Sequence, residues 1–367
     1  MVNKVKTCVY AIALNEIKHV DKFMEASKDA DVVLVCDTGS TDGTVERLRE
    51  LGAVVHCIKQ QPWRFDVPRN TALNLIPSDI DICLSIDLDE YLQPNWVEAI
   101  DVEWQKSNGQ LKRISYDYIW NWLDDGVTPD IRFYADKIHH RHGYFWRHPC
   151  HETLYWEGEG HETRITIPGV VLHHRADISK SRGQYLPLLK LAVEEDPRND
   201  RMCHYYGREL MFYNYFKEAI DELTRHLSLP NAQWKEERCA SMRYISRSYR
   251  SLGQHDNSVE WAIKATQEWP YTREPWLELA RAAYSKKDWL TCFWAAKKCI
   301  SITEPSRTYM GSNDCWGSDP YDLGGIAAWY SGMKEEARHL CEMALERSPT
   351  DDRLRRNCEL VGVNLSK

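Results

Sequence analysis

The sequence predicts an α/β domain with an open, mostly parallel sheet, followed by an all-helical repeat domain. Three observations support this fold class. In the first 100 residues, short apolar runs alternate with segments of helical periodicity, which is typical of successive β-α-β units. From about Leu111 to Leu172 the rhythm breaks into short aromatic β runs, as in an irregular mixed-sheet continuation of the same domain. From about Ser179 onward only helical periodicity remains, so we expect domains at residues 1–178 and 179–367.

The elements of the first domain follow from apolar runs and capping residues. The run Asp31–Cys36 is continuously apolar, as expected for a strand covered on both faces. Thr41–Leu51 begins with Thr-Asp-Gly-Thr, whose side chains can cap a helix. The further strands are expected at Thr7–Leu14, Ala53–Ile58 and Asp81–Ile86, and the further helices at His19–Ala30 and Pro68–Leu75. Ligands of such sheets bind at the carboxyl ends of the strands.

The second domain contains four similar segments, each a turn, an amphipathic helix and a nearby proline. Small residues occupy equivalent places in them: Ala219, Ser258, Cys292 and Ala337. Their separations are 39, 34 and 45 residues. The tetratricopeptide period is about 34 residues, so one interval matches and two carry insertions. Such repeats bury their apolar faces by stacking, which predicts a curved helical solenoid.

Composition narrows the class of protein. The net charge of −8 argues against a uniformly basic nucleic-acid binder. The 12 cysteines include no CxxC pair, and several lie in apolar runs, as buried free thiols of a reducing compartment do. No stretch reaches about 18 apolar residues, so we expect no membrane insertion and a cytoplasmic protein.

Asp87-Leu88-Asp89 follows the predicted strand Asp81–Ile86. Two carboxylates one residue apart point to the same side of an extended chain, where they can share one hard cation. The cation would neutralise a departing diphosphate. An acidic pair alone is weak evidence, because most such pairs are solvated turns. Its place after a buried strand favours a site.

Two further motifs lie at neighbouring strand ends. Asp37 opens Asp-Thr-Gly-Ser-Thr-Asp-Gly-Thr, a tight strand-to-helix turn whose helix N-terminus can attract a phosphate. Asp37 can accept hydrogen bonds from a base or ribose, although the turn can also be simply well capped. Arg69, in Trp63-Arg-Phe-Asp-Val-Pro-Arg-Asn70, can pair with a phosphate through its planar fork, or it can be a surface arginine.

Together, Asn15-Glu16, the turn at Asp37, the W-x-F-D-x-x-R-N segment and the acidic motif at 87–90 resemble glycosyltransferase family 2 of the GT-A fold. The resemblance covers roughly residues 5–100. The rest is similar to bacterial and tailed-phage proteins in which such a domain is fused to tetratricopeptide repeats. The segments HPCHETL, LHHRADISKSRGQYLPLLKLAVEEDP and REPWLELA carry that second resemblance.

The resemblance implies a metal-dependent, inverting hexosyl- or pentosyltransferase that uses a nucleotide sugar, often UDP-linked. Asp37 would contact the base or ribose, and Asp87 the ribose and the metal. Asp89 would bind manganese or magnesium directly. Arg69 would contact the donor. Asn15 and Glu16 would line the nucleotide pocket.

Eight of the 14 histidines lie between His139 and His174. In GT-A enzymes a late histidine often completes the metal site, and we prefer His173 to His174, although both can be structural. An inverting transfer needs a base near the acceptor hydroxyl. Glu152 or His151 is the candidate by position, and Glu90 and Asp125 are alternatives. His151-Glu-Thr recurs as His161-Glu-Thr, and either copy can be structural.

The acceptor is the least determined feature. The basic, aromatic segment Lys137–His148 suits a nucleic acid, a glycan or a plain surface loop. The phage-like resemblance makes a hydroxymethylpyrimidine in DNA the leading candidate, with a protein side chain or a surface glycan as alternatives. Two other functions remain. One is a non-catalytic repeat scaffold with a degenerate sugar-nucleotide domain. The other is a nucleotidyltransferase, which ranks last because this sequence lacks the glycine-rich, basic N-terminal loop that such enzymes need.

Overall fold

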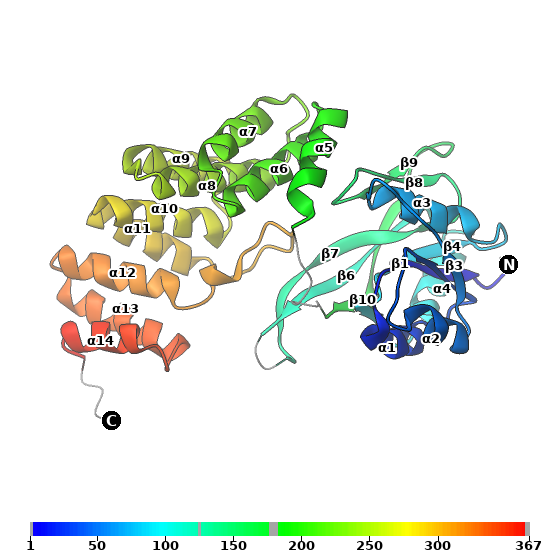
Figure 1. Ribbon diagram of the computed structural model, residues 1–367. Coiled ribbons are helices and arrows are strands. Elements are labelled where there is room, and N and C mark those ends of the chain that lie inside the picture. Colours follow the sequence, from blue (N-terminus) through cyan, green and yellow to red (C-terminus); the bar gives the residue numbers. More distant parts are fainter. Residues whose placement is uncertain (1–2, 124–125, 176–182, 364–367) are drawn as a thin grey trace. The chain divides into compact units, whose positions relative to one another are not determined.

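The computed structural model describes residues 3–123, 126–175 and 183–363, and it divides into two compact units, Met1–Leu188 and Leu189–Lys367. The predicted domain boundary at residue 178 lies outside the described residues. We describe each unit by itself. We call the first the sheet domain and the second the helical domain (Figure 1).

The sheet domain contains one eight-stranded mixed sheet in the order β3-β2-β1-β4-β7-β6-β10-β5. Its strands are β1 Thr7–Ala13, β2 Val32–Asp37, β3 Val54–Cys57, β4 Ile82–Ser85, β5 Glu90–Leu92, β6 Arg113–Trp122, β7 Pro129–His140 and β10 Arg164–His174. The strands β3, β2, β1 and β4, which are neighbours in the sheet, pair in parallel, as predicted. β7 is antiparallel to both β4 and β6. The carboxyl ends of β1, β2 and β4 therefore share one edge, where the predicted motifs lie.

Helices and a hairpin cover both faces of this sheet (Figure 1). On one face, Val9 of β1 packs in the core that includes side chains of α1, α2 and α4. On the other, Tyr10 packs with side chains of α3 and of the hairpin β8–β9. The ranges are α1 Ile17–Ser27, α2 Thr44–Glu50, α3 Asp66–Leu75, α4 Trp96–Lys106, β8 Tyr144–Arg147 and β9 Thr153–Trp156. The alternation of Val9 and Tyr10 between two cores explains why β1 is apolar throughout.

The region predicted to be irregular, from Leu111 to Leu172, instead contains the three longest strands described in this domain: β6, β7 and β10, of 10, 12 and 11 residues. The predicted mixed-sheet continuation is confirmed, and β8 and β9 are short, but the length of these three strands was not predicted. Register shifts interrupt both β6–β7 and β6–β10. Each shift breaks the regular alternation of apolar and polar residues, so long strands look short in the sequence.

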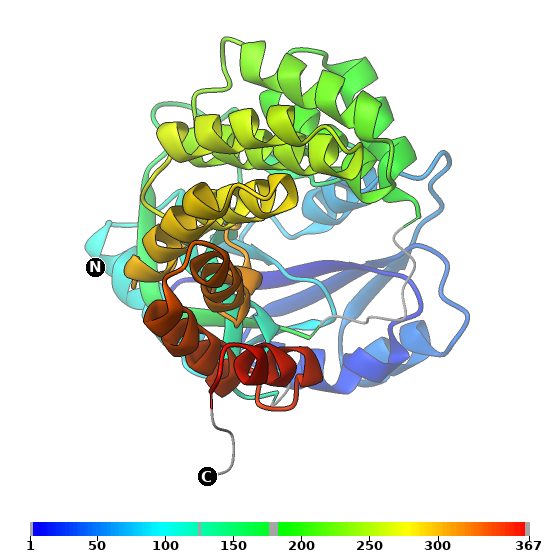
Figure 2. The same cartoon turned by 90° about the vertical axis from the view of Figure 1, so that its left-hand side faces the viewer.

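The helical domain consists of antiparallel helix pairs stacked one on the next. Figure 2 shows this stack with the helical domain facing the viewer. Helix α5, Tyr185–Glu195, spans the division between the units. The pairs are α6 Asp200–Phe212 with α7 Phe216–Ser228, α8 Lys235–Ser251 with α9 His255–Glu268, α10 Arg273–Lys286 with α11 Trp289–Ser301, and α12 Asp319–Tyr330 with α13 Lys334–Arg347, followed by α14 Asp352–Leu360. Each first helix also contacts the first helix of the next pair. Among the described helices, none combines the length and apolarity that a membrane crossing requires.

The four small residues aligned in the sequence are all fully buried in the second helix of a pair. Space there is limited. A Cβ atom at Gly325 of α12 would lie 2.8 Å from Sγ of Cys341 in α13, which is closer than side chains tolerate. Tight approach of paired helices requires small residues at such positions. The tetratricopeptide-like repeat prediction is confirmed in this respect.

Candidate active site

The paired aspartates lie just beyond the carboxyl end of β4, as predicted. The loop that carries them is anchored by the buried side chains of Ile86 and Leu88. The backbone N–H of Asp87 donates to Oε2 of Glu90 at 2.9 Å. Glu90 is itself buried and accepts from the hydroxyl of Tyr118 at 2.6 Å. Glu90 therefore fixes the loop, which makes it a supporting residue rather than a candidate base.

Arg69 is buried, and it joins two carboxylates. Its Nη2 donates to Oδ1 of Asp87 at 2.8 Å, and its Nε donates to Oε1 of Glu152 at 2.5 Å. Its Nη1 donates to the hydroxyl of Ser85 at 3.2 Å. Desolvation would raise the pKa of Asp87, but the positive charges of Arg69 and Lys137 hold it well below its usual value. The structure therefore excludes the surface-arginine interpretation of Arg69 and brings it together with Asp87 and Glu152.

Lys137 lies beside the paired aspartates, whereas the sequence analysis named it only as the start of the basic segment Lys137–His148. Its Nζ lies 3.4 Å from Oε1 of Glu90 and 3.8 Å from Oδ2 of Asp87. Burial would lower the pKa of Lys137, but these carboxylates raise it above its usual value. Lys137 belongs to β7, which pairs with β4 although the two strands are far apart in the sequence.

Asp89 faces His174, not His173. Nε2 of His174 lies 3.4 Å from Oδ2 of Asp89, and Nδ1 of His174 lies 2.9 Å from the carbonyl oxygen of Trp120. Burial would lower the pKa of His174, but Asp89 shifts it upward. His173 stacks on Trp122, with ring centroids 5.2 Å apart. Successive residues of β10 point to opposite faces, so only one of the two histidines can face the aspartates. The geometry therefore corrects our preference for His173.

The turn after β2 brings Asp37 and Asn15 together. Oδ1 of Asp37 accepts from the backbone N–H groups of Gly39 and Ser40, both at 2.9 Å. Its Oδ2 is buried and has no hydrogen-bond partner among the described residues. Asn15 accepts from the backbone N–H of Thr41 at 2.9 Å. Gly39 has φ of 122°, a conformation that suits glycine.

Glu16 lies next to this turn. Its backbone N–H donates to the hydroxyl of Thr44 at 2.8 Å. The hydroxyl of Thr44 also donates to Oδ1 of Asp42 at 2.6 Å, and the same oxygen accepts from the backbone N–H of Thr44, the first residue of α2, at 3.1 Å. The N-cap residue itself is Gly43, so the predicted side-chain cap at that position is absent. The ends of β1 and β2 are thus tied together by side-chain hydrogen bonds.

The two His-Glu-Thr copies have different surroundings. Glu152 is tied to Arg69 at the site, and His151, next to it, has φ of 48°. Glu162 instead accepts from Tyr144 at 2.8 Å and pairs with Arg113 at 2.7 Å. The second copy is therefore a structural element, and only the first belongs to the site. The alternative base Asp125 lies outside the described residues.

The segment from Lys137 to His148 does not form an exposed basic strip. His139 is buried and lies 2.9 Å from the hydroxyl of Tyr10, and burial lowers the pKa of His139 to about 3. Arg141 donates to the carbonyl oxygen of Ile76 at 2.6 Å. Most of these basic side chains hold the domain together, so the segment gives no support of its own to a nucleic-acid acceptor.

Among the residues that the structure describes, the carboxylates at the site outnumber the permanent cations that contact them. The interacting carboxylates are those of Asp87, Asp89, Glu90 and Glu152. They face two permanent cations, Arg69 and Lys137, which leaves two negative charges when His174 is neutral. Within the described ranges, no three His, Cys, Asp or Glu side chains converge on one point as around a bound ion. At the aspartate motif, the side chains of Asp89 and His174 face each other, as two ligands of one metal ion would.

Comparison with known proteins gives a distant relationship. No protein-family model matches the chain. It is similar to the SPbeta prophage-derived glycosyltransferase SunS of Bacillus subtilis (strain 168), with 22% identity over 244 residues, 59% of this chain and 52% of SunS. Glycosyltransferase SunS of Bacillus phage SPbeta matches equally. The chain thus spans about half the length of the curated relatives it matches.

Solved structures share the helical fold. MamA superposes with a TM-score of 0.39 and 16% identity, covering 49% of this chain and 99% of MamA. The TPR protein YrrB superposes with a TM-score of 0.39 and 12% identity, covering 47% of this chain and 81% of YrrB. Likeness at this level describes the fold alone.

Proposed function

We propose that the sheet domain is a glycosyltransferase that takes a sugar from a nucleotide donor, UDP-linked, with a divalent cation, manganese or magnesium, held at Asp87, Asp89 and His174. The observation that carries the proposal is the pair formed by Asp89 and His174. The distant similarity to glycosyltransferase SunS supports the reaction class. The acidic motif at a strand end supports the place.

The hydrogen bonding of His174 supports a cation. A backbone carbonyl only accepts, so Nδ1 of His174 must donate its proton to the carbonyl of Trp120, 2.9 Å away. In the neutral ring, Nε2 is then a lone pair, and it faces a carboxylate oxygen of Asp89 at 3.4 Å. Two acceptors that face each other either share a proton or share a cation. Fixing a ligand histidine through its other nitrogen is what metal sites require. The excess of two negative charges also matches a divalent ion.

The chain's own residues would act on the donor as follows. Asp37 has a buried oxygen with no partner among the described residues, so it can accept from the N–H of a base or a ribose hydroxyl. Asn15 and Glu16 lie beside that turn and line the nucleotide pocket. Asp87 contacts ribose and cation, while Arg69 holds its carboxylate in place. When bound, the cation neutralises the charge that develops on the leaving diphosphate.

Glu152 and His151 remain the proposed bases for the acceptor hydroxyl. Glu152 is 12% exposed at its side chain and also orients Arg69. Loss of Glu152 would therefore affect two functions, the positioning of Arg69 and the transfer of the proton.

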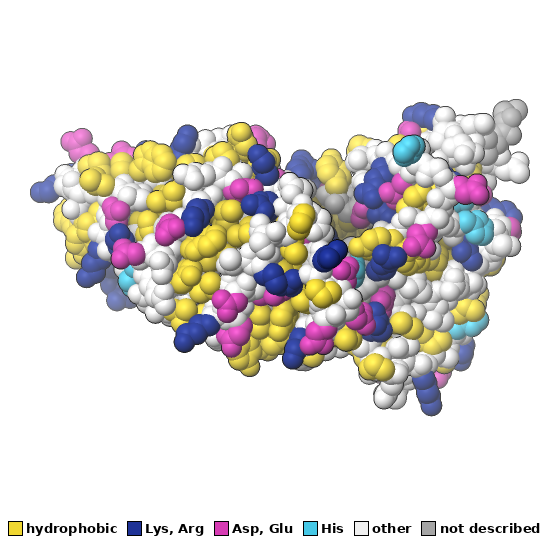
Figure 3. Space-filling view, turned by 90° about the horizontal axis from the view of Figure 1, so that it is seen from above, with side chains coloured by type: hydrophobic (Ala, Val, Ile, Leu, Met, Phe, Trp, Pro, Cys, Tyr) yellow, Lys and Arg dark blue, Asp and Glu magenta, His cyan; other side chains and the backbone are white. Residues whose placement is uncertain are grey.

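The acceptor is proposed to be macromolecular. A hydroxymethylpyrimidine in DNA stays the first candidate to test, with a protein or surface glycan beside it. On the face drawn in Figure 3, basic and acidic side chains are interspersed rather than gathered by sign. A DNA acceptor would therefore be bound through specific contacts and not through a broad basic surface on that face.

The test is calorimetric titration of the full chain with UDP in the presence and absence of MnCl₂. We expect manganese-dependent binding that is weakened at least about tenfold in both D89N and H174A, because each variant removes one cation ligand. H173A and D29N are matched controls, since His173 faces Trp122 and Asp29 is exposed at the end of α1.

Absence of UDP binding by the wild type would overturn the proposal in favour of a degenerate scaffold. Binding without manganese, unchanged in D89N, would remove the cation site. A screen of nucleotide sugars against hydroxymethylated DNA, unmodified DNA and cell-wall fractions, read by mass spectrometry, then identifies sugar and acceptor.

A further inference from the structure

Aromatic side chains of the long strands surround the proposed cation ligand His174. Its ring stacks on that of Trp120 in β6, with ring centroids 6.0 Å apart and an angle of 25° between the planes. It also stacks on the ring of Tyr118, in the same strand, at 6.2 Å. Phe133 of β7 meets the Tyr118 ring edge-on at 5.2 Å. We call these four residues the aromatic wall.

The aromatic wall lies on the face of the sheet that carries the candidate site. The hydroxyl of Tyr118 donates to Oε1 of Glu90, and His174 faces Asp89. Trp120 follows Tyr118 by two residues, and residues two apart in a strand point to the same face. The backbone carbonyl of Trp120 also accepts from Nδ1 of His174 at 2.9 Å. Trp120 thus contacts the proposed cation ligand with its ring and with its backbone.

Trp120 differs from the rest of the aromatic wall in its exposure. It is 41% exposed, whereas Tyr118 behind it is 6% exposed. A single exposed aromatic residue needs no explanation by itself. Trp120 is distinguished by its place, because its ring is held against His174 and so has lost much of its freedom to move. A ligand that covers such a ring gains contact area at little further cost in side-chain entropy.

Two of the candidate acceptors offer a flat surface to an indole. A pyranose ring has one face of C–H groups, and its hydroxyl groups stand at the rim. A hydroxymethylpyrimidine is also flat, but in DNA it is flanked by phosphates. Both can stack on tryptophan, whose ring is large and apolar with one polar edge. Stacking alone therefore does not separate the two.

Charge separates them. The carboxylates at the site exceed the permanent cations by two, and the diphosphate of a nucleotide sugar brings about two further negative charges. A divalent cation compensates about two of the four, so the loaded site stays negative. On β7, Arg132 pairs with Asp117, whose place in β6 turns it to the opposite face from Tyr118 and Trp120. Phosphates beside Trp120 would be repelled, whereas an uncharged sugar would not.

We propose that Trp120 is the stacking platform for the acceptor, and that the acceptor hydroxyl belongs to an uncharged sugar ring. The inference rests on the proposed sugar transfer, and it places a neutral glycan ahead of DNA among the acceptors. The acceptor oxygen bonds to the anomeric carbon of the donor as the bond from that carbon to the diphosphate breaks. The hydroxyl proton passes to Glu152 or His151, and UDP leaves.

The experiment measures binding of the full chain, with UDP and MnCl₂ present, to three kinds of immobilised ligand. They are neutral hexose and N-acetylhexosamine oligosaccharides, uronic-acid oligosaccharides of the same lengths, and duplex DNA that contains 5-hydroxymethylcytosine. We expect a neutral oligosaccharide to bind at least about tenfold more tightly than the acidic ligands do. Its affinity should change less than about twofold between roughly 50 and 500 mM NaCl, because no phosphate contacts are made.

Three variants test the platform. W120A should weaken binding of the neutral oligosaccharide at least about tenfold, and W120F, which keeps a flat ring, should weaken it less. Y134A is the matched control. Tyr134 of β7 is 45% exposed, close to the value for Trp120, but it pairs with Asp117 and so lies on the opposite face of the sheet. Y134A should bind the oligosaccharide as the wild type does.

Calorimetric titration with UDP and MnCl₂ separates binding of the acceptor from support of His174. In W120A the affinity for UDP should fall less than the affinity for the oligosaccharide. Equal losses would assign Trp120 to the cation site and overturn the inference. Unchanged oligosaccharide binding in W120A, or tighter binding of the hydroxymethylated DNA, would overturn it as well.

The proposed function and this inference fail in different ways. A wild type that binds UDP but no neutral oligosaccharide would overturn the inference alone. A wild type that binds a neutral oligosaccharide through Trp120 but binds no UDP would overturn the proposed donor site and retain the platform. Binding of neither ligand would overturn both.

Discussion

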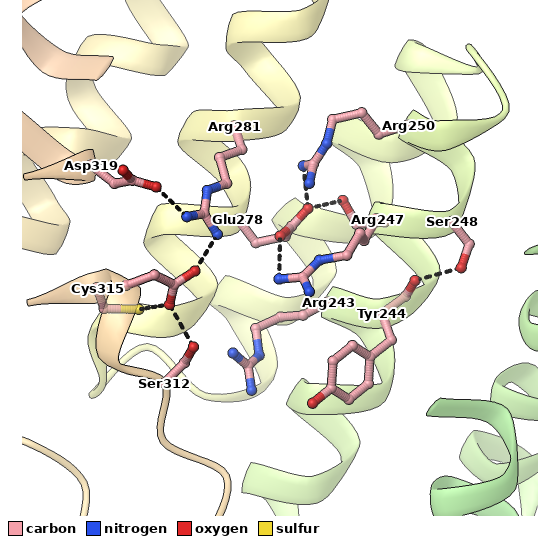
Figure 4. Close-up of polar contacts among 12 residues, drawn as sticks. Arg243, Tyr244, Arg247, Ser248, Arg250, Glu278, Arg281, Ser312, Cys315 and Asp319 are labelled. Atoms are coloured by element: carbon pink, nitrogen blue, oxygen red, sulfur yellow. Dashed lines mark hydrogen bonds and ion pairs between the residues drawn. The ribbon is translucent and has the colours of Figure 1, made fainter. Parts of the chain in front are cut away.

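The two domains each contain a network of arginines and carboxylates, but only one network is closed. In the helical domain, Arg247 and Arg250 of α8 face Glu278 of α10, and Arg281 faces Asp314 and Asp319 (Figure 4). Three cations meet three carboxylates. In the sheet domain, the four carboxylates at the candidate site meet two permanent cations, and Nε2 of His174 faces a carboxylate oxygen of Asp89.

This difference distinguishes a network that stabilises a fold from one that is prepared for a ligand. A balanced set of ion pairs satisfies its own members, so nothing further is needed. An excess of carboxylates costs free energy unless a cation arrives. Arg69 holds the carboxylate of Asp87 in place beside the proposed cation site, while Arg250 pairs with Glu278 where α8 packs against α10.

The largest expected effect comes from removing the central cation of each network. R69M should lower the free energy of unfolding by about 3 kcal/mol or more, because it leaves Asp87 and Glu152 facing each other without their buried counter-ion. R281M should cost only about 1 kcal/mol, since its partners are 36% and 44% exposed and water can replace the arginine. Urea unfolding of both variants measures the difference. Equal losses would contradict the comparison.

Acid should lower the stability of both domains, and this effect is intermediate in size. Burial lowers the pKa of His139 from 6.5 to about 3 in the sheet domain, and it lowers the pKa of His204 in the helical domain. Below pH 6.5 the unfolded chain binds protons that the folded chain does not, so stability is complete above pH 6.5 and declines as the pH falls towards 3. His139 contributes about 1.4 kcal/mol per pH unit within that window, and His204 acts in the same direction.

The measurement is urea unfolding at pH 7 and pH 5, with H139Q as the matched variant. Glutamine can still accept from the Tyr10 hydroxyl, but it does not titrate. We expect a shallower loss of stability in H139Q than in the wild type. An identical pH dependence would show that His139 is not a buried neutral group.

The smallest effect concerns thiols and sharpens the contrast between the domains. Cys57, at the end of the edge strand β3, is exposed, whereas all seven cysteines of the helical domain are buried. The Cys57 thiolate should therefore attack an aromatic disulfide reagent quickly, forming a mixed disulfide and releasing one equivalent of the aromatic thiolate. C57S should show no such fast release. C57S should change stability by less than about 0.5 kcal/mol. A second fast thiol in the native chain would indicate that the helical domain opens.

Sequence reasoning predicted the parallel part of the sheet because its signals are local. The apolar run before Asp37, the capping residues before α2 and the position of Asp87 and Asp89 after β4 depend only on near neighbours in the chain. The helical repeats were predictable for the same reason, since Ala219 and its three counterparts mark close helix packing at a regular spacing. The long strands β6, β7 and β10 were missed, because register shifts break their alternation.

The amino-acid sequence by itself determined the fold class and the place of the candidate site at the carboxyl ends of the parallel strands. Only the tertiary structure decided which side chains meet there. Strand alternation turned His174 rather than His173 towards Asp89, and antiparallel pairing of β7 with β4 brought Lys137 beside Asp87. The connection between α11 and α12, residues 302–318, shows the same limit, since its length is visible in the sequence but its contacts with Arg243 and Glu274 are not. Contacts between residues distant in sequence depend on register and packing, which no local pattern encodes.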